Sequence, residues 1–411
     1  MMTEQNNTTN RAWTLAWSLV AYLCAGTVST LISVYLPVIV NELKNSPATD
    51  QELGSTGAYV SAIFLYGWMI GGILLGWLSD RIGRKKVLAL ASSLFGIATV
   101  MIIIVSNWQL LIFYRFISGI GIGGTLVVST VLISEIWPAK SRAIVQGILS
   151  VSFPVGIVAT GGLNLIFTDW RQAFWLGIIP VIAAIGMMIF IKESFNYTKK
   201  EAASQDIKNI FDTQIRNSLL SGSLIFGAVL IGLWGLFSWM PTWVQTILPA
   251  GHDGNQERGL TMMLLGSGGI TGGILSGFVI RRYGDRKTLM IAFAGLTIIS
   301  CILFLTNGVF SKIVYIETVI LALFFGISQG ALSNYIPELF PSTVRASSTG
   351  FCFNIGRFFT ATAVFFVGSL VTILGGFSRA LLLFSLTFII ALIATYRTNN
   401  QKINHLNPSS I

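Results

Sequence analysis

The stretch GWLSDRIGRKK, from Gly76 to Lys86, is a short charged turn between two long apolar runs, at 57–79 and 87–105. A membrane-spanning helix needs roughly 20 mostly apolar residues, and each flanking run supplies them. Gly76 lets two helices approach closely, and Gly83 permits the tight reversal that so short a connection requires. The stretch therefore predicts two spanning helices joined by a tight, positively charged turn.

The composition of the whole chain indicates that lipid is its solvent. Of 411 residues, 53% are hydrophobic and 10% are charged, whereas a soluble protein carries about a quarter of charged residues. Backbone groups in lipid must be bonded within the protein, and alternating strand patterns are absent, so the apolar runs are predicted to be helices. We expect an all-α integral membrane protein with twelve spanning helices, at 13–40, 57–79, 87–105, 109–131, 143–167, 172–191, 219–248, 259–280, 288–307, 313–333, 346–371 and 380–396.

The positions of the basic residues predict the orientation in the membrane. With the N-terminus inside, the inner connections hold 19 Lys and Arg residues and the outer ones hold five. Because cytoplasmic loops carry the excess of Lys and Arg, we expect a multi-pass protein of the cell (inner) membrane with both termini in the cytoplasm. The net charge of +10 follows from this bias. The charges form no basic stripe interleaved with aromatic residues, so we expect no nucleic-acid partner.

An internal repeat divides the chain into two halves. GGILLG at 71–76 recurs as GGILSG at 272–277. Four further residues recur 203 positions later, with Glu135, Pro138, Arg142 and Gly147 returning as Glu338, Pro341, Arg345 and Gly350. We expect a six-helix bundle at 1–191, a polar cytoplasmic linker at 192–218 and a second bundle at 219–411, related by pseudo-two-fold symmetry. In transporters built from such repeats, the substrate site lies between the halves near the midplane.

Two arginines, Arg115 and Arg357, lie well inside apolar runs, whereas all 16 Asp and Glu residues lie outside the middles of these runs. Arg357 is twelve residues beyond Arg345, about 18 Å along a helix and therefore near the midplane. An ionised group there costs at least about 2.5–3.5 kcal/mol unless it faces a wet cavity or a partner. The planar guanidinium suits a carboxylate or phosphate, so we predict that Arg357 binds an anionic substrate.

Each arginine has an alternative role. Arg357 can instead bond helix carbonyls or Asn354 and only lock the bundle. Arg115 lies about a turn and a half inside its helix, and there a structural role is favoured over substrate binding.

Weaker candidates for a substrate site lie in the seventh, tenth and eleventh predicted helices. Glycine and proline interrupt the seventh, at 232, 235 and 241, and such interruptions mark substrate-lining helices. Aromatic faces can hold a ring or a sugar, although packing against lipid explains either tryptophan of that helix alone. The lining candidates are Trp234, Trp239, Gln329, Asn334 and Asn354.

Charged residues at the inner helix ends are candidates for a gate. Glu135 with Arg142, and Glu338 with Arg345, can form pairs that close the cytoplasmic side and break when the bundles rock. Static anchoring of the loops explains them about as well, because exposed pairs contribute at most about 1 kcal/mol. Their placement by the internal repeat favours gating.

Nothing in the sequence indicates an enzyme, a cofactor or a metal. No phosphate-binding loop, metal-spaced set of His and Cys or nucleophile–base pair is present. His252 and His405 lie in polar loops, where we expect them to be solvated and far from a second ligand. The three cysteines fall in apolar runs and are predicted to be small buried residues.

Several motifs make the chain resemble the major facilitator superfamily. GWLSDRIGRKK is similar to its signature loop, with Gly76, Asp80, Arg81, Gly83 and Arg84 at the signature positions. In the second copy, 277–287, Arg281 replaces the acid. RFISGIGIGG at 115–124 resembles the second motif of the family, and PELFPSTVRA at 337–346 resembles the sugar and organic-acid porters. WRQAFWLGIIP at 170–180 and SWMPTW at 238–243 resemble the aromatic-acid and sialate symporters.

The resemblance implies a secondary transporter that works by alternating access. Together with the lone Arg357, it favours uptake of a small organic anion, namely an aromatic, sugar or other carboxylic acid. Organic-acid relatives carry an acidic pair in the first helix, where this chain has Gly26 and Thr27. Coupling through the usual carboxylate is therefore not expected. The remaining modes of transport are facilitation, exchange, or coupling through protonation of a rim acid such as Glu135 or Asp80.

Three alternatives are kept: a neutral-sugar facilitator, a drug or metabolite exporter, and a non-transporting membrane sensor on the same scaffold. We expect a monomer in the lipid bilayer whose partners are a small solute and, at most, a coupling ion.

Overall fold

The computed structural model describes residues 2–44, 46–193, 213–341 and 344–398, and this part of the chain is almost wholly helical. In the first half, α1 covers Met2–Lys44, α2 Asp50–Ile82, α3 Arg84–Met101, η1 Ile102–Ile104, α4 Trp108–Ile136, α5 Ala139–Ile166, α6 Trp170–Phe174, η2 Trp175–Gly177 and α7 Ile178–Phe190. In the second half, α8 covers Thr213–Thr246, α9 Asn255–Thr306, α10 Ile313–Glu338, α11 Arg345–Phe365, α12 Val367–Leu374, α13 Phe377–Ser385 and α14 Thr387–Arg397.

The predicted twelve spans are confirmed within these residues. Ten helical stretches are long and apolar enough to cross a membrane, and α11 with α12, bent by 43°, forms an eleventh span. The 52-residue α9 is interrupted at Gly284, where φ is 78° and ψ is 162°. α9 therefore comprises two spans and not one. The ten stretches, the α11–α12 span and the additional span within α9 together make twelve.

The helices extend beyond the apolar runs that predicted them. The second predicted helix, 57–79, is observed as Asp50–Ile82, and Thr49 starts it with a capping box to Glu52. Hydropathy detects only the part of a helix that crosses lipid, whereas a cap satisfies the exposed backbone N–H groups and lets the helix begin in the aqueous region.

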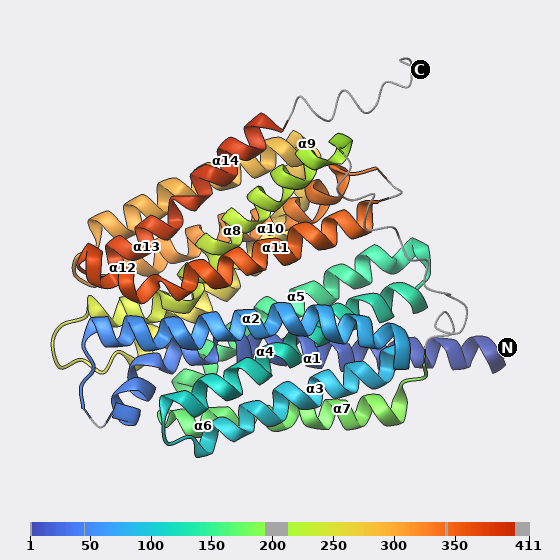
Figure 1. The fold of residues 1–411 in the computed structure, drawn as a ribbon, viewed down its shortest axis with the longest axis horizontal. Coiled ribbons are helices and arrows are strands. Elements are labelled where there is room, and N and C mark those ends of the chain that lie inside the picture. The colour runs from blue at the N-terminus through green and yellow to red at the C-terminus, as the bar shows by residue number, and fades with distance from the viewer. Residues whose placement is uncertain (1, 45, 194–212, 342–343, 399–411) are drawn as a thin grey trace.

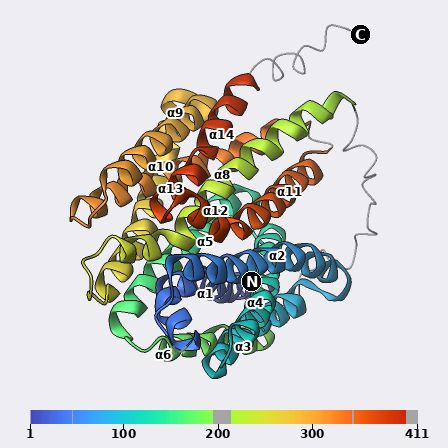
Figure 2. The ribbon, with the colours of Figure 1, turned by 60° about the vertical axis from the view of Figure 1, so that its left-hand side comes forward.

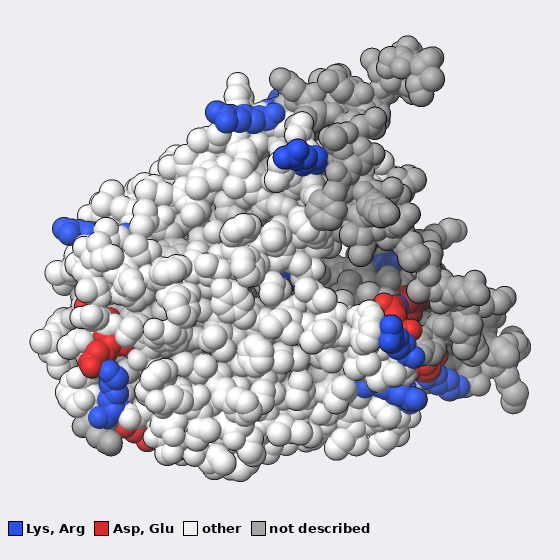
Figure 3. Space-filling view, viewed as in Figure 1, with Lys and Arg blue, Asp and Glu red and all other residues white. Residues whose placement is uncertain are grey.

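The helices form two groups that lie side by side. Figures 1 and 2 show α1–α7 on one side and α8–α14 on the other. We call the end where α1 begins and α14 ends the terminal end, and the end with the connection between α1 and α2 the distal end. Charged side chains gather near the two ends, and the broad band between them is uncharged, as expected for a surface that faces lipid (Figure 3). Most of the predicted linker, 194–212, lies outside the described residues.

The internal repeat is visible in the backbone. Gly83 and Gly284 occupy equivalent positions, 201 residues apart, and both have positive φ, of 107° and 78°. Only glycine adopts such angles without strain, which explains why both tight turns carry it. Arg142 donates to the carbonyl of Trp137, and Arg345 donates to the carbonyl of Phe340. The two halves therefore share a local structure at the terminal end.

Candidate substrate site

The two bundles touch closely toward the distal end. A β-carbon on Gly54 of α2 would lie 3.1 Å from the Cα of Gly368 of α12. Gly161 of α5 lies against the backbone of Gly259 of α9. Gly57 of α2 lies against the ring of Trp239. Small residues let backbones approach in this way, and the contacts close the space between the bundles at this end.

Three glycines of the repeat near the terminal end make no such close contact. A β-carbon on Gly147, Gly277 or Gly350 would meet nothing within 4 Å. Gly147 and Gly350 are equivalent positions of the repeat, so both halves present open space there. A side chain could be accommodated at both of these equivalent positions.

Arg357 of α11 is the central charged group of the candidate site. Its side chain is partly exposed, and among the residues that the structure describes, none accepts a hydrogen bond from it or forms an ion pair with it. The guanidinium interacts electrostatically with Tyr22 of α1, in the other bundle. The hydroxyl of Tyr22 is bonded to the carbonyl of Leu126, at 2.9 Å, and to the hydroxyl of Thr130, at 2.7 Å. Arg357 thus keeps its donors free beside a polar group held in place by α4.

An aromatic cluster lies next to Arg357 on the distal side. Ala361 and Val364 follow it by one and two turns of α11 and pack in the same apolar cluster as Trp68, Phe153 and Trp234. The ring of Trp68 meets Trp234 of the other bundle edge to face, with centroids 5.4 Å apart. It also meets Phe153, at 5.8 Å. We call Trp68, Phe153 and Trp234 the aromatic floor.

Arg115 is placed differently from Arg357. Its side chain is 3% exposed, and it donates to the carbonyls of Val28, at 2.9 Å, and Ser29, at 3.2 Å. Its guanidinium also lies 3.8 Å from the ring centroid of Phe64. These contacts tie α4 to α1 and α2. They occupy the groups that a substrate would need, so the geometry favours the structural role over substrate binding.

The other predicted lining residues divide into two groups. Trp239 is fully buried against Gly57 and Phe377, so it offers no surface to a solute in this conformation. Asn354 is partly exposed but donates within its own helix, to the carbonyl of Gly350. Gln329 has a buried amide nitrogen without a hydrogen-bond partner among the described residues, and Asn334 is exposed near the terminal end of α10. Gln329 and Asn334 thus keep polar groups free for another molecule.

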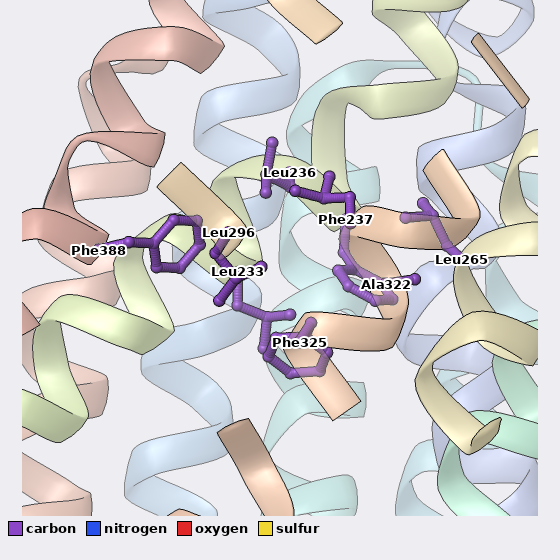
Figure 4. Close-up of a pocket in the computed structure, with 9 residues that line it drawn as sticks. Leu233, Leu236, Phe237, Leu265, Leu296, Ala322, Phe325 and Phe388 are labelled. Atoms are coloured by element: carbon purple, nitrogen blue, oxygen red, sulfur yellow. The ribbon is translucent and has the colours of Figure 1, made fainter. Parts of the chain in front are cut away.

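The structure shows one further small cavity, which is not a site for an anion. It lies inside the second bundle and is lined by hydrocarbon side chains, among them Leu233, Phe237, Phe325 and Phe388 (Figure 4). A charged group placed there would lose its hydration without gaining a partner.

The distal loop also brings together a group that the sequence analysis did not expect. His252 lies near Asp253 and Glu257, with potential ligand atoms within 4.8 Å of one another. The prediction that His252 has no second ligand nearby was wrong, because the helical turn at the start of α9 returns Glu257 to the loop. The Nδ1 of His252 accepts the N–H of Gly254, and we assign no metal to the group. His405 lies outside the described residues.

At the terminal end, the predicted signature loop forms a charged network. Arg84 pairs with Asp80, at 2.5 Å, and with Glu135 of α4, at 3.2 Å. Glu193 accepts the N–H of Lys85, at 3.1 Å, and its carboxylate fills the space beside Gly83. The turn at the end of α2 is thereby fastened to α4 and to the segment after α7.

This network accords with the sequence match to known proteins. Residues 18–363 match the Major Facilitator Superfamily. The chain belongs to the major facilitator superfamily. Its members are transporters, so this chain is a transporter and not an enzyme. The resemblance seen in the motifs is confirmed.

Individual superfamily members extend the comparison. The cis,cis-muconate transport protein of Acinetobacter baylyi is 29% identical over 380 residues, covering 88% of this chain and 89% of its own. The benzoate transport protein of the same organism is 22% identical, covering 92% and 88%. The crystal structure of a D-xylose-proton symporter superposes with a TM-score of 0.77 at 17% identity, covering 95% and 97% of the two chains. The last likeness shows the superfamily fold.

Three of the four residues in the predicted gate pairs of this superfamily member contact groups of their own half. Glu135 pairs with Arg84, and Arg142 and Arg345 donate to backbone carbonyls of their own halves. Arg81 stacks on Trp77, at 3.8 Å from its centroid, and Gly76 contacts Val127 of α4. These contacts lie within the halves and not between them.

Sequence reasoning missed Tyr22, Trp68 and Phe153. Trp68 lies in the middle of the predicted second helix, as Trp234 does in the seventh, so its depth was an available signal. Tyr22 and Phe153 carry no such signal, since only the packing of α1 against α4 and of α5 against α2 shows where they point.

Proposed function

We propose that this protein takes up a small organic anion, most favourably an aromatic or conjugated carboxylic acid, by alternating access. The carboxylate binds Arg357, and the apolar body lies against the aromatic floor. The terminal end faces the cytoplasm of a cell with this protein in its inner membrane, so the structure corresponds to an inward-facing state of a monomeric carrier.

The free guanidinium of Arg357 is the observation that carries this proposal. A cation near the midplane is costly unless it meets water or an anion. The guanidinium of Arg115 is stabilised by hydrogen bonds to backbone carbonyls. Among the described residues, Arg357 has no such acceptors. A planar fork of donors binds a carboxylate through two parallel hydrogen bonds, so an organic acid fits the group that is left unpaired.

The aromatic floor supports an aromatic or conjugated body for the solute. Rings prefer edge-to-face or offset contacts with other rings, and Trp68, Phe153 and Trp234 already show such contacts among themselves. The muconate and benzoate named for two relatives are a conjugated and an aromatic carboxylate. The relatives therefore point to the same chemistry as the site.

Coupling to an ion is proposed at the rim and not at the midplane. α1 offers no carboxylate there, since Gly26 packs against the backbone of Phe153 and Thr27 bonds to Gly156 of α5. Glu135 is partly buried and has one carboxylate oxygen without a hydrogen-bond partner among the described residues. Protonation of Glu135 or Asp80 would weaken the network around Arg84, while exchange or facilitation would need no proton at all.

Transport by purified protein in proteoliposomes tests the proposal. We expect saturable uptake of labelled benzoate that unlabelled cis,cis-muconate inhibits. Benzamide, which has the same ring without the charge, should not inhibit. Uptake of xylose with no effect of benzoate would favour the sugar facilitator and overturn the anion proposal. Binding of benzoate without any flux would favour the membrane sensor.

Replacing Trp234 by alanine should weaken transport of aromatic acids. Ring–ring contacts contribute about 0.5–1.5 kcal/mol, so we expect the KM for benzoate to rise about two- to tenfold. Trp234→Phe should restore most of the loss. Trp175→Ala is the matched control, because Trp175 is 53% exposed on the surface. An unchanged KM in Trp234→Ala would remove this ring from the site.

A further inference from the structure

Two asparagines join the bundles at the distal end. The side-chain amide of Asn164, on α5, donates to the carbonyl of Asn255, at 2.6 Å. The side-chain amide of Asn255, at the start of α9, donates to the carbonyl of Asn164, at 3.0 Å. Each residue is thus both donor and acceptor for the other, across the boundary between the two bundles.

The pair is held in position, with Asn164 buried and Asn255 partly buried. Asn164 is fully buried, so its hydrogen bonds do not compete with bulk water in this conformation. Arg258, 2% exposed, reaches the side-chain oxygen of Asn255 at 3.4 Å and the carbonyl of Asp253 at 2.8 Å. Arg258 is also bonded to Gln245 of α8. The start of α9 is therefore fixed to its own bundle, and the asparagine pair connects this rigid unit to α5.

Close backbone contact accompanies the asparagine pair. Gly161, one turn before Asn164, lies against the backbone of Gly259, one turn after Asn255. Any side chain on Gly161 would overlap that backbone. The next residue, Gly162, has open space where a β-carbon would be. Only one of these two adjacent glycines is therefore required for closure.

We propose that the Asn164–Asn255 pair, with the Gly161–Gly259 contact, is the latch of the distal gate and sets the balance between states open to opposite ends. This inference rests on the proposed function only in that a carrier must open its distal end. Opening separates α5 from α9, so both hydrogen bonds must break and the amides of Asn164 and Asn255 must find water instead. Without the latch, the distal-open state is more populated.

The distance between the bundles tests this latch without any substrate. We replace Cys24, Cys301 and Cys352 by alanine and place spin labels at Thr168 and Gly308, which are exposed at the distal ends of the two bundles. Electron paramagnetic resonance then measures the distribution of label-to-label distances in lipid nanodiscs. For the unaltered latch we expect mainly the short distance of the closed distal end.

Two sets of variants have defined outcomes. In Asn164→Ala/Asn255→Ala, the ratio of the long to the short distance should rise at least about fivefold, since two hydrogen bonds are lost. Gly161→Leu should give the long distance almost alone, whereas Gly162→Leu should match the unaltered protein. Unchanged distances in both the asparagine variant and Gly161→Leu would overturn the latch. Because the readout needs no solute, a failure of benzoate uptake does not affect it.

Transport supplies a second readout. A carrier that is competent to bind from outside for a larger fraction of time has a lower apparent KM at that face. We expect the asparagine double variant to lower the external KM for benzoate and to slow the return step, with Gly161→Leu inactive in net uptake. If Gly161→Leu fails to fold, the asparagine variants still decide the proposal.

Discussion

Replacing Arg357 by glutamine is expected to reduce the kcat/KM of benzoate uptake about 100-fold. Hydrogen bonds to charged groups contribute about 1.5–3 kcal/mol each, and a carboxylate on the guanidinium makes two of them. Since no described residue depends on Arg357 for a hydrogen bond or ion pair, the amount of folded protein should not change. Uptake into proteoliposomes, normalised to monodisperse protein, measures both quantities.

Two control variants define what this result means. Arg357→Lys keeps the charge but loses the planar fork, so it should retain an intermediate activity. Arg379→Gln removes a positive charge at an exposed distal position, where Arg379 donates to the carbonyl of Leu374, and should transport normally. Full activity in Arg357→Gln would show that the solute is bound elsewhere.

Replacing Arg115 by glutamine should have the opposite pattern, a large loss of stability. The change removes two charge-assisted hydrogen bonds between α4 and α1 and the contact with Phe64. We expect the free energy of unfolding to fall by about 2–4 kcal/mol and the melting temperature in detergent to fall by about 5 °C. Thermal unfolding monitored by tryptophan fluorescence measures this change.

Comparing the stability and the benzoate binding of the Arg115 and Arg357 variants distinguishes a structural role from substrate binding. Arg115→Gln protein that remains folded should still bind benzoate with nearly normal affinity, because Arg115 does not face the solute. A melting temperature equal to that of the unaltered protein, with benzoate binding lost, would exchange the roles assigned to Arg115 and Arg357.

The fold could be predicted from the sequence because the patterns that indicate it, the apolar runs and the internal repeat, are long and occur more than once. Runs of about 20 apolar residues define spans by length alone, and the copies around Gly83 and Gly284 mark equivalent turns. The ends of the helices were harder to predict from the sequence. Thr49 extends α2 by a capping box, and the bend between α11 and α12 depends on packing, which hydropathy does not record.

The site followed only in part. Depth in an apolar run identified both Arg115 and Arg357 and already favoured a structural role for Arg115, but the contacts that each side chain makes depend on which face of its helix it occupies. The carbonyls of Val28 and Ser29 reach Arg115 only because α1 crosses α4 there. Trp239 looked like a lining residue from its depth, yet Gly57 on another helix leaves a space that its ring fills. Contacts between distant segments decided each case.

A structure of the protein with bound benzoate tests the central claim most directly. We expect the carboxylate to lie within hydrogen-bond distance of both terminal nitrogens of Arg357, with the ring against Trp68, Phe153 or Trp234. A benzoate bound away from Arg357, with that guanidinium bonded to protein groups instead, would contradict it.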